Sequence, residues 1–487
     1  MYIVTAISSI CSQHKFFVMK KAFLVCLLGL MISSTYAQGI VGDWYGNLSV
    51  QGTTIPLVFH IAKSGDTYTT LMDSPNQGAK GLATDKTTFS ANLLSVDASK
   101  YGIKYTGTFL PDSNQVKGTF SQGGMQLPLL LTAKPTAAAP LVARPQDPVS
   151  FPYKQEQVTF ENTKAGVKLT GTLTLPADGK ITKVVVLISG SGAQNRNEDM
   201  GQLNHRPFLV WSDWLTRNGI AVLRYDDRGV GESTGSFQTG TTADFADDAE
   251  AAVTYLQLRP DMQGVRIGLA GHSEGGLIAP MVASRNKAVK FVVLLAAPGI
   301  PITQLMAKQT ADITRQAGAS EKIAEMNGAT NEKVYQVVKD NPSMPNNELE
   351  AKLTAVLTEQ WKKYPSNAFG KNKLENIIKA SINTVTTPWF RYFLGMDPTG
   401  YLAKTTCPVL ALNGTLDMQV NSVANLAGIS NSLKKAGNKN HQEIPMLSLN
   451  HLFQKAKTGG VSEYGSLEET VNPEVLTKVT SWITALP

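Results

Sequence analysis

The sequence predicts an α/β fold, a mostly parallel sheet with helices on both faces, preceded by a small all-β domain. From about residue 153 onward, short apolar and β-branched runs alternate with helix-forming stretches, the pattern of strands buried on both faces. Residues 38–134 instead consist of β-rich runs separated by Gly, Asn, Asp and Ser clusters. A proline-rich segment at 135–152 indicates a stiff, extended linker between the two parts. The length of 487 residues fits such a multidomain chain.

Residues 1–37 have the pattern of a secretory signal peptide. Lysines at 20 and 21 follow Met19, an apolar stretch covers residues 22–32, and Thr-Tyr-Ala at 35–37 forms a small-residue cleavage site. The apolar stretch is shorter than the roughly 20 residues that cross a bilayer. Met19 fits the translation start better than Met1, because the residues before it add nothing that a signal peptide needs. We therefore expect export to the periplasm or the cell exterior, with no transmembrane span in the mature form.

The composition of the expected mature protein excludes some partners. Removal of residues 1–37 takes away three of the 45 basic residues and none of the 38 acidic ones, leaving a net charge of +4. The basic residues are scattered, so no nucleic-acid partner is expected. Only Cys407 remains, which allows no intrachain disulfide, and its place at a strand entry predicts a buried structural thiol.

The β-rich part at 38–134 predicts a small barrel or sandwich, because alternating runs such as 54–62 and 104–110 suit antiparallel strands with one buried face. Its opening Gly-Asp-Trp-Tyr-Gly at 42–46 resembles the first strand of lipocalin-like barrels. His60 stands alone on a β run and is expected to be structural. No motif in this part identifies a partner.

The second part, at about 153–487, opens with a hairpin at 157–162 and 168–175. The expected strands that follow lie at 184–189, 221–225, 265–270, 291–296 and 409–413, with helices between them, for instance at 243–259 and 422–436. Residues 301–395 interrupt this alternation with helix-forming sequence rich in Lys, Glu and Gln. Because this insertion lies between two strands of the sheet, we expect a helical lid over the strand ends.

The motif Gly-His-Ser-Glu-Gly at 271–275 directly follows the apolar run 265–270 and directly precedes a helix-forming stretch at 276–283. A Gly-x-Ser-x-Gly pattern in an isolated loop is weak evidence of function. Between a strand and a helix, it is the nucleophile elbow, which exposes the serine hydroxyl at the edge of a sheet. Ser273 is therefore the expected nucleophile.

A serine nucleophile needs a histidine base and a carboxylate, which follow it in the order acid then histidine on this kind of fold. His451 lies in an apolar loop after an expected strand, whereas His441 lies in a polar turn, so His451 is the expected base. Asp417 follows the strand at 409–413 and a glycine turn. Its rival Asp397 precedes that strand and is expected to cap a turn.

Two backbone N–H groups are expected to form an oxyanion hole. One belongs to Glu274, the residue after the nucleophile. The other is expected at Ser191, in the glycine-rich loop 190–193 after the first central strand, which lacks the Lys of a phosphate-binding loop. A second glycine loop at 229–233 also lacks nucleotide-binding partners, and the preceding Asp-Asp-Arg at 226–228 is expected to form a structural charge network.

The motifs at 188–192, 224–231, 271–276, 413–420 and 449–454 together resemble the α/β-hydrolase superfamily, with the bacterial serine aminopeptidase-like esterases as the most similar branch. The resemblance covers about 155–487. It departs from the family pattern at the oxyanion loop, where the usual His-Gly is replaced by Ser189 and Gly190.

Together with the expected signal peptide, this resemblance implies an exported serine hydrolase, a carboxylesterase that cleaves small to medium acyl esters through an acyl-enzyme and needs no metal or organic cofactor. An exopeptidase for short peptides is the nearest alternative, and it would need lid carboxylates to hold a substrate ammonium. Four candidates are Glu321, Glu325, Glu332 and Glu375. A non-catalytic binding protein on a hydrolase scaffold is a further alternative. The aromatic cluster at 389–393 fits either a lid or pocket wall or ordinary core packing.

Overall fold

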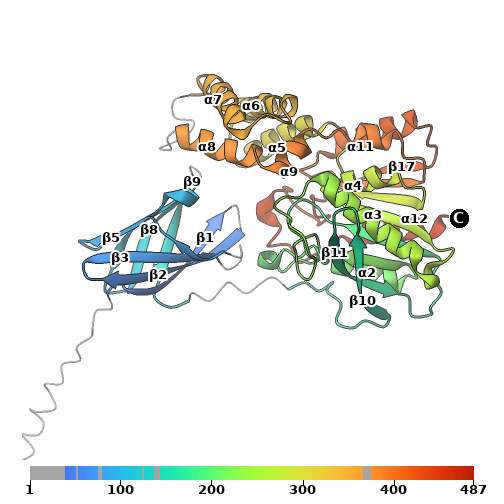
Figure 1. The fold of residues 1–487 in the computed structure, drawn as a ribbon, viewed down its shortest axis with the longest axis horizontal. Helices are drawn as coiled ribbons and strands as arrows, with labels where there is room; N and C mark the ends of the chain where they lie inside the picture. The colour runs from blue at the N-terminus through green and yellow to red at the C-terminus, as the bar shows by residue number, and fades with distance from the viewer. Residues whose placement is uncertain (1–38, 51–52, 75–78, 123–124, 136–142, 366–373) are drawn as a thin grey trace, which may run out of the picture.

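The computed structural model describes residues 39–50, 53–74, 79–122, 125–135, 143–365 and 374–487 (Figure 1). The expected signal peptide at 1–37 and residues 136–142 of the expected linker lie outside these ranges. Within them, no helix combines the length and the apolar character needed to cross a bilayer.

The N-terminal domain is a closed antiparallel barrel. Its strands are β1 (Gly42–Val50), β2 (Thr53–Ser64), β3 (Thr67–Ser74), β4 (Ala79–Ala83), β5 (Lys86–Ser90), β6 (Leu93–Ala98), β7 (Ile103–Leu110), β8 (Gln115–Gln122) and β9 (Met125–Thr132). The sheet order is β2-β1-β9-β8-β7-β6-β5-β3-β4, and an additional pairing of β2 with β3 closes the ring. The β-rich part therefore forms a barrel rather than a sandwich, in the up-and-down arrangement typical of lipocalin-like proteins.

Large side chains fill the barrel interior. Trp44 in β1 is buried and donates from Nε1 to the Ile40 carbonyl oxygen at 2.8 Å. The buried Tyr105 hydroxyl donates to the carbonyl oxygen of Val116 at 3.0 Å. Gly107 and Gly118 stand opposite each other on β7 and β8, and a Cβ on Gly118 would lie 2.7 Å from the Tyr105 ring. The paired glycines thus leave the space that this ring occupies.

The second domain contains an eight-stranded sheet in the order β10-β11-β13-β12-β14-β15-β16-β17. The strands are β10 (Lys154–Asn162), β11 (Val167–Leu175), β12 (Lys183–Ile188), β13 (Ala221–Tyr225), β14 (Arg266–His272), β15 (Val289–Leu295), β16 (Val409–Gly414) and β17 (His441–Met446). β11 runs antiparallel to both neighbours, and all pairings from β13 to β17 are parallel. Consequently the loops after β12, β14, β16 and β17 meet at one edge of the sheet.

Helices cover both faces of this sheet. α2 (Pro207–Arg217) and α12 (Pro473–Ala485) pack on one face, whereas α3 (Thr242–Leu258), α4 (Glu274–Ala283) and α11 (Ser422–Lys435) pack on the other. Side chains along β12 alternate between the two faces, so that Val184 and Val186 lie in one core and Val185 and Leu187 lie in the other. A central strand buried on both faces must be apolar throughout, which is the pattern of the sequence.

A helical insertion separates β15 from β16. It comprises α5 (Ile302–Gln316), α6 (Glu321–Asp340), α7 (Asn346–Trp361), α8 (Leu374–Val385) and α9 (Pro388–Leu394), and the short α10 (Thr399–Leu402) leads back to the sheet. Figure 1 shows α5 to α9 grouped together on the side of α3 and α4. The insertion expected at 301–395 is therefore helical, and its role as a lid stays a prediction.

Part of the expected linker is docked on the second domain. The guanidinium of Arg144 is buried and donates to backbone carbonyl oxygens in two separate loops, including Leu203 at 2.7 Å and Tyr464 at 3.3 Å. Gln146 accepts from the Thr470 N–H at 2.6 Å and donates to the Val471 carbonyl oxygen at 2.6 Å. The described end of this segment is therefore anchored rather than extended freely.

Candidate active site

Ser273 lies in a strained turn between β14 and α4. Its backbone angles are φ 52° and ψ −116°, in a region that non-glycine residues rarely adopt. Close packing around the turn requires glycine, because a Cβ on Gly271 would lie 2.0 Å from the carbonyl oxygen of Gly275, and one on Gly275 would lie 2.1 Å from that of Ile188. The residues around the serine are buried, but Ser273 itself is only half-buried. This is the geometry of a nucleophile elbow.

Asp417 and His451 form a buried hydrogen-bonded pair at the same edge of the sheet. Asp417 follows β16 and His451 follows β17, and Nδ1 of His451 lies 2.8 Å from Oδ2 of Asp417. Asp417 is 4% exposed and His451 is 3% exposed. The other carboxylate oxygen of Asp417, Oδ1, accepts from the backbone N–H groups of Gln419 and Val420, each at 2.8 Å. These two donors fix the orientation of the carboxylate.

The elbow and the loop of His451 are in direct contact. His272, the residue before the serine, donates from Nε2 to the carbonyl oxygen of His451 at 3.1 Å. The two histidine rings have centroids 4.9 Å apart and are tilted by 43°. The structure thus brings Ser273, Asp417 and His451 to one edge of the sheet.

The two rival residues lie elsewhere. His441 is the first residue of β17, at the opposite end of the strand from His451, and Nδ1 of its ring lies 2.7 Å from Oε1 of Glu443. Asp397 accepts from the N–H and the hydroxyl of Thr399, at 3.0 and 2.7 Å, at the start of α10. Asp397 therefore caps a turn, as the sequence predicts.

The loop after β12 lies against the nucleophile. A Cβ on Gly190 would be only 3.2 Å from Cβ of Ser273. The Gly190 N–H donates to Oε1 of Glu198 at 2.8 Å, so it is engaged within the loop, whereas Ser191 is exposed. Glu274 is the first residue of α4, where a backbone N–H has no partner within the helix. These positions are compatible with the two donors expected at Ser191 and Glu274.

The sequence does not predict the burial of two acidic side chains beside the nucleophile. Glu198 is 2% exposed, adopts φ 52°, and its Oε1 lies 2.9 Å from Nδ1 of His272. Glu274 is also buried, and its Oε1 accepts from the Thr242 hydroxyl at 2.7 Å and from Nε1 of Trp389 at 3.0 Å. Burial raises the pKa of the Glu274 carboxyl, although hydrogen bonds from Thr242, Trp389 and Ser191 oppose the rise. Glu198 lies in a polar run without periodicity, and the motif around Glu274 predicts a role for its backbone N–H but not the burial of its side chain.

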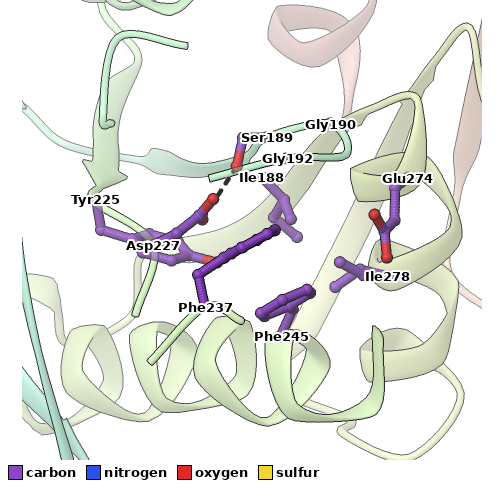
Figure 2. Close-up of a pocket in the computed structure, with 10 residues that line it drawn as sticks. All are labelled: Ile188, Ser189, Gly190, Gly192, Tyr225, Asp227, Phe237, Phe245, Glu274 and Ile278. Carbon is purple, nitrogen blue, oxygen red and sulfur yellow. Dashed lines mark hydrogen bonds between the residues drawn. The ribbon is translucent and has the colours of Figure 1, made fainter. Parts of the chain in front are cut away.

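A cavity of about 10 Å³ lies beneath the glycine-rich loop, lined by residues that include Gly190, Asp227, Phe237 and Glu274 (Figure 2). This volume is about that of one water molecule. Asp227 accepts from the Ser189 hydroxyl at 3.2 Å and from the Gln194 N–H at 2.9 Å. Burial raises the pKa of Asp227 to about 8, because its ionised form has no cationic partner.

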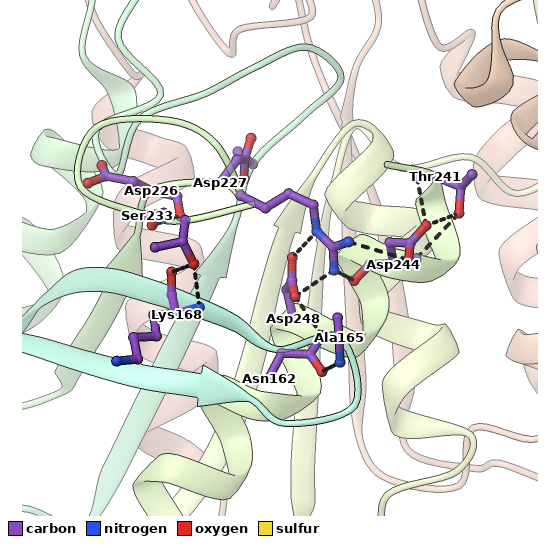
Figure 3. Close-up of polar contacts among 12 residues, drawn as sticks. Asn162, Ala165, Lys168, Asp226, Asp227, Ser233, Thr241, Asp244 and Asp248 are labelled. Carbon is purple, nitrogen blue, oxygen red and sulfur yellow. Dashed lines mark hydrogen bonds and ion pairs between the residues drawn. The ribbon is translucent and has the colours of Figure 1, made fainter. Parts of the chain in front are cut away.

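The neighbouring residues Asp226 and Arg228 take part in structural ion pairs with other segments. Nε of Arg228 lies 2.7 Å from Asp248, which also accepts from Nδ2 of Asn162 at 2.7 Å (Figure 3). Asp226 binds the guanidinium of Arg196 at 2.6 Å. The expected charge network therefore exists, but it connects these residues to β10, α3 and the loop after β12 rather than to one another.

The insertion presents its carboxylates to solvent. Glu321, Glu325, Glu332 and Glu375 are all exposed, and Glu321 is paired with Arg315 at 2.6 Å. None of these four carboxylates therefore reaches a buried position beside Ser273. In contrast, Trp389 of α9 stacks on Phe393 with ring centroids 5.0 Å apart and also reaches the elbow through Glu274. The aromatic cluster packs within the insertion, and its Trp389 also connects the insertion to the site through the hydrogen bond to Glu274.

The sheet order, the elbow after β14 and the acid and histidine after β16 and β17 define an α/β-hydrolase. Residues 184–368 match the protein family described as "Serine aminopeptidase, S33". This segment of the chain is therefore similar to the serine aminopeptidase-like branch of the α/β-hydrolase superfamily.

Two curated relatives and two solved structures are similar to parts of the chain. Esterase EstD of Thermotoga maritima is 31% identical over 166 residues, which cover 34% of this chain and 36% of the relative. Uncharacterized protein YfhR of Escherichia coli O157:H7 is 28% identical over 149 residues, covering 29% of this chain and 47% of YfhR. The chain thus spans less than half the length of either relative.

The solved structures give weaker likenesses. The Pyrococcus furiosus esterase Pf2001 has a TM-score of 0.41 at 16% identity, covering 71% of this chain and 98% of the esterase. Est1E of Butyrivibrio proteoclasticus, solved with ferulic acid bound, has a TM-score of 0.39 at 18% identity, covering 67% of this chain and 98% of Est1E.

Proposed function

We propose that this protein is a serine carboxylesterase that hydrolyses small to medium acyl esters. One observation carries the proposal: a buried carboxylate–imidazole pair, 2.8 Å long, lies beside a strained and half-buried serine at the carboxyl edge of the sheet. The similarity of residues in this domain to Esterase EstD supports an ester rather than a peptide substrate. The four lid glutamates, which were the candidates to hold a substrate ammonium, are exposed, and this supports the same choice.

In the proposed reaction, the hydroxyl of Ser273 attacks the acyl carbon while Nε2 of His451 accepts its proton. Asp417 holds Nδ1–H of His451 and stabilises the imidazolium that forms. His451 then returns the proton to the leaving alcohol, and water releases the acyl group with the same histidine as base. Backbone N–H groups of Glu274 and Ser191 would stabilise the oxyanion.

The test compares p-nitrophenyl esters of increasing acyl length with aminoacyl p-nitroanilides as substrates. Ester hydrolysis should dominate, and Ser273→Ala should abolish both this activity and labelling by a fluorophosphonate probe. Anilide turnover far above ester turnover would favour the exopeptidase. Failure of the folded protein to react with the probe would favour a non-catalytic binding role.

We also propose that the enzyme is exported, on the strength of the basic, apolar and small-residue segments within 1–37. Expression of the full chain in a bacterial host, followed by fractionation and N-terminal sequencing, tests this. A mature protein that begins at residue 38 outside the cytoplasm is expected. An uncleaved cytoplasmic product would exclude export.

A further inference from the structure

Glu198 has a backbone conformation and a buried environment that are both unfavourable for a glutamate. Its φ of 52° lies in the left-handed region, where a side chain with a Cβ is strained, and its carboxylate is almost fully buried. Both features cost free energy in the folded state. Strained residues of this kind persist where the surrounding structure holds them for a function.

Oε1 of Glu198 connects two separate parts of the site. It accepts from the Gly190 N–H at 2.8 Å and lies 2.9 Å from Nδ1 of His272. The other ring nitrogen of His272 faces the carbonyl oxygen of His451 at 3.1 Å. A single chain of contacts therefore runs from the oxyanion loop through the elbow to the loop of the general base.

The protons in this chain can be counted. A carbonyl oxygen only accepts, so Nε2 of His272 carries a hydrogen. Oε1 already accepts from Gly190, and a second proton lies in its contact with Nδ1. Burial alone would lower the pKa of His272, but the charge of Glu198 and its hydrogen bond raise it above the ordinary value. With that proton on the ring, the pair is a carboxylate and an imidazolium.

We propose that Glu198 and His272 are positioning residues, a buried ion pair that holds the His451 loop and the oxyanion loop in register with Ser273 for acyl transfer. This inference rests on the proposed esterase function. It assigns each histidine ring its own carboxylate, Asp417 for His451 and Glu198 for His272. When His451 becomes protonated during catalysis, the neighbouring cation at His272 is already neutralised by Glu198.

The variant Glu198→Gln removes the charge but keeps the shape. The amide oxygen can still accept from Gly190, yet an imidazolium at His272 then has no counter-charge, so the ring loses one proton and one of its two contacts. We expect kcat for a p-nitrophenyl ester to fall about 10- to 100-fold, the effect of a small misplacement of reacting groups. KM should change less than about twofold, because the pair does not touch the substrate.

The matched control is Glu443→Gln, which breaks a second carboxylate–histidine contact, 2.7 Å long, at the other end of β17. Its kcat should stay within about twofold of the wild type. In the wild type, the alkaline limb of kcat should report loss of the ring proton, and in Glu198→Gln it should move to lower pH. The charges of Glu198 and Asp417 and the hydrogen bond to the His451 carbonyl oxygen act on this titration, whereas the nearby His205, whose pKa burial lowers to about 4, is uncharged there.

Nitrogen-15 histidine spectra of the Ser273→Ala protein, with His272→Asn as the assignment standard, measure the pair without any turnover. Both ring nitrogens of His272 should carry hydrogen at pH 7, and Glu198→Gln should leave one. A singly protonated His272 in the parent, or a Glu198→Gln enzyme with kcat within about twofold of the wild type, would overturn the proposal. Full ester hydrolysis by Ser273→Ala would instead overturn the proposed function, and the spectra would still decide the state of the pair.

Discussion

Replacing Asp417 with asparagine should force His451 into the wrong tautomer. The backbone N–H groups of Gln419 and Val420 both point at Oδ1 and require an oxygen there. The asparagine amide must therefore place its NH₂ group at the position of Oδ2, 2.8 Å from Nδ1 of His451. An NH₂ donor makes Nδ1 an acceptor and moves the ring hydrogen to Nε2, where it blocks proton transfer from Ser273.

The expected loss in kcat is about 10⁴-fold, the effect of the wrong tautomer in a serine triad. This corresponds to about 5 kcal/mol of lost transition-state stabilisation. KM should change little, since Asp417 is buried and does not face the substrate. The assay is steady-state hydrolysis of a p-nitrophenyl ester, with nitrogen-15 spectra of the histidines to identify the tautomer of His451.

The control is Asp397→Asn, at the rival acid, which is exposed and should leave kcat within about twofold of the wild type. An Asp417→Asn enzyme that retains a tenth or more of the wild-type kcat would refute the reasoning. So would a spectrum in which the hydrogen of His451 remains on Nδ1.

Three further predictions concern stability. Asp227→Asn should flatten the pH dependence of the free energy of unfolding, measured in urea. The pKa of Asp227, raised to about 8, makes the native state hold a proton that the unfolded chain releases. The wild-type free energy of unfolding should therefore fall by up to about 4 kcal/mol from pH 5 to pH 8. Parallel curves for the two proteins would contradict this. Trp389→Phe removes the donor to Glu274 and should destabilise the protein by about 1.5–3 kcal/mol in the same assay, more than Trp214→Phe, which loses a bond to a neutral hydroxyl. Gly118→Ala places a Cβ 2.4 Å from the Thr106 carbonyl oxygen and should cost the barrel about 1–3 kcal/mol, measured by circular dichroism, while esterase kcat stays unchanged. Equal stability of the alanine variant would show that the barrel can relax around the glycine pair.

The strands of the second domain could be predicted because burial on both faces makes them apolar throughout. The expected strand at 184–189 is β12 (Lys183–Ile188), and the expected strand at 409–413 is β16 (Val409–Gly414). The sheet order was not predicted, because right-handed crossovers do not decide on which side of β12 each later strand is added. The choice between barrel and sandwich could not be made, since both give the same alternation. Closure depends on the pairing of Tyr45 with Thr132 at opposite ends of the domain sequence.

Residues of the candidate site could be predicted from the sequence only where they follow a strand. Asp417 and His451 each come after an apolar run, so their place at the edge of the sheet is implied by position. Glu198 follows no strand directly and lies in a run of polar residues. Glu198 is buried because the loop after β12 folds back and places it against His272. The local sequence pattern does not predict the course of this loop.

The docked segment around Arg144 determines where a separate hydrolase domain should begin. A truncated protein that begins at the first strand of the sheet, β10 (Lys154–Asn162), lacks this guanidinium, and the carbonyl oxygens of Leu203 and Tyr464 lose a buried donor. Both carbonyls belong to loops that flank the site, one after β12 and one after His451. A hydrolase domain separated from the barrel should therefore begin before Arg144, because the segment that contains Arg144 and Gln146 is bonded to the second domain.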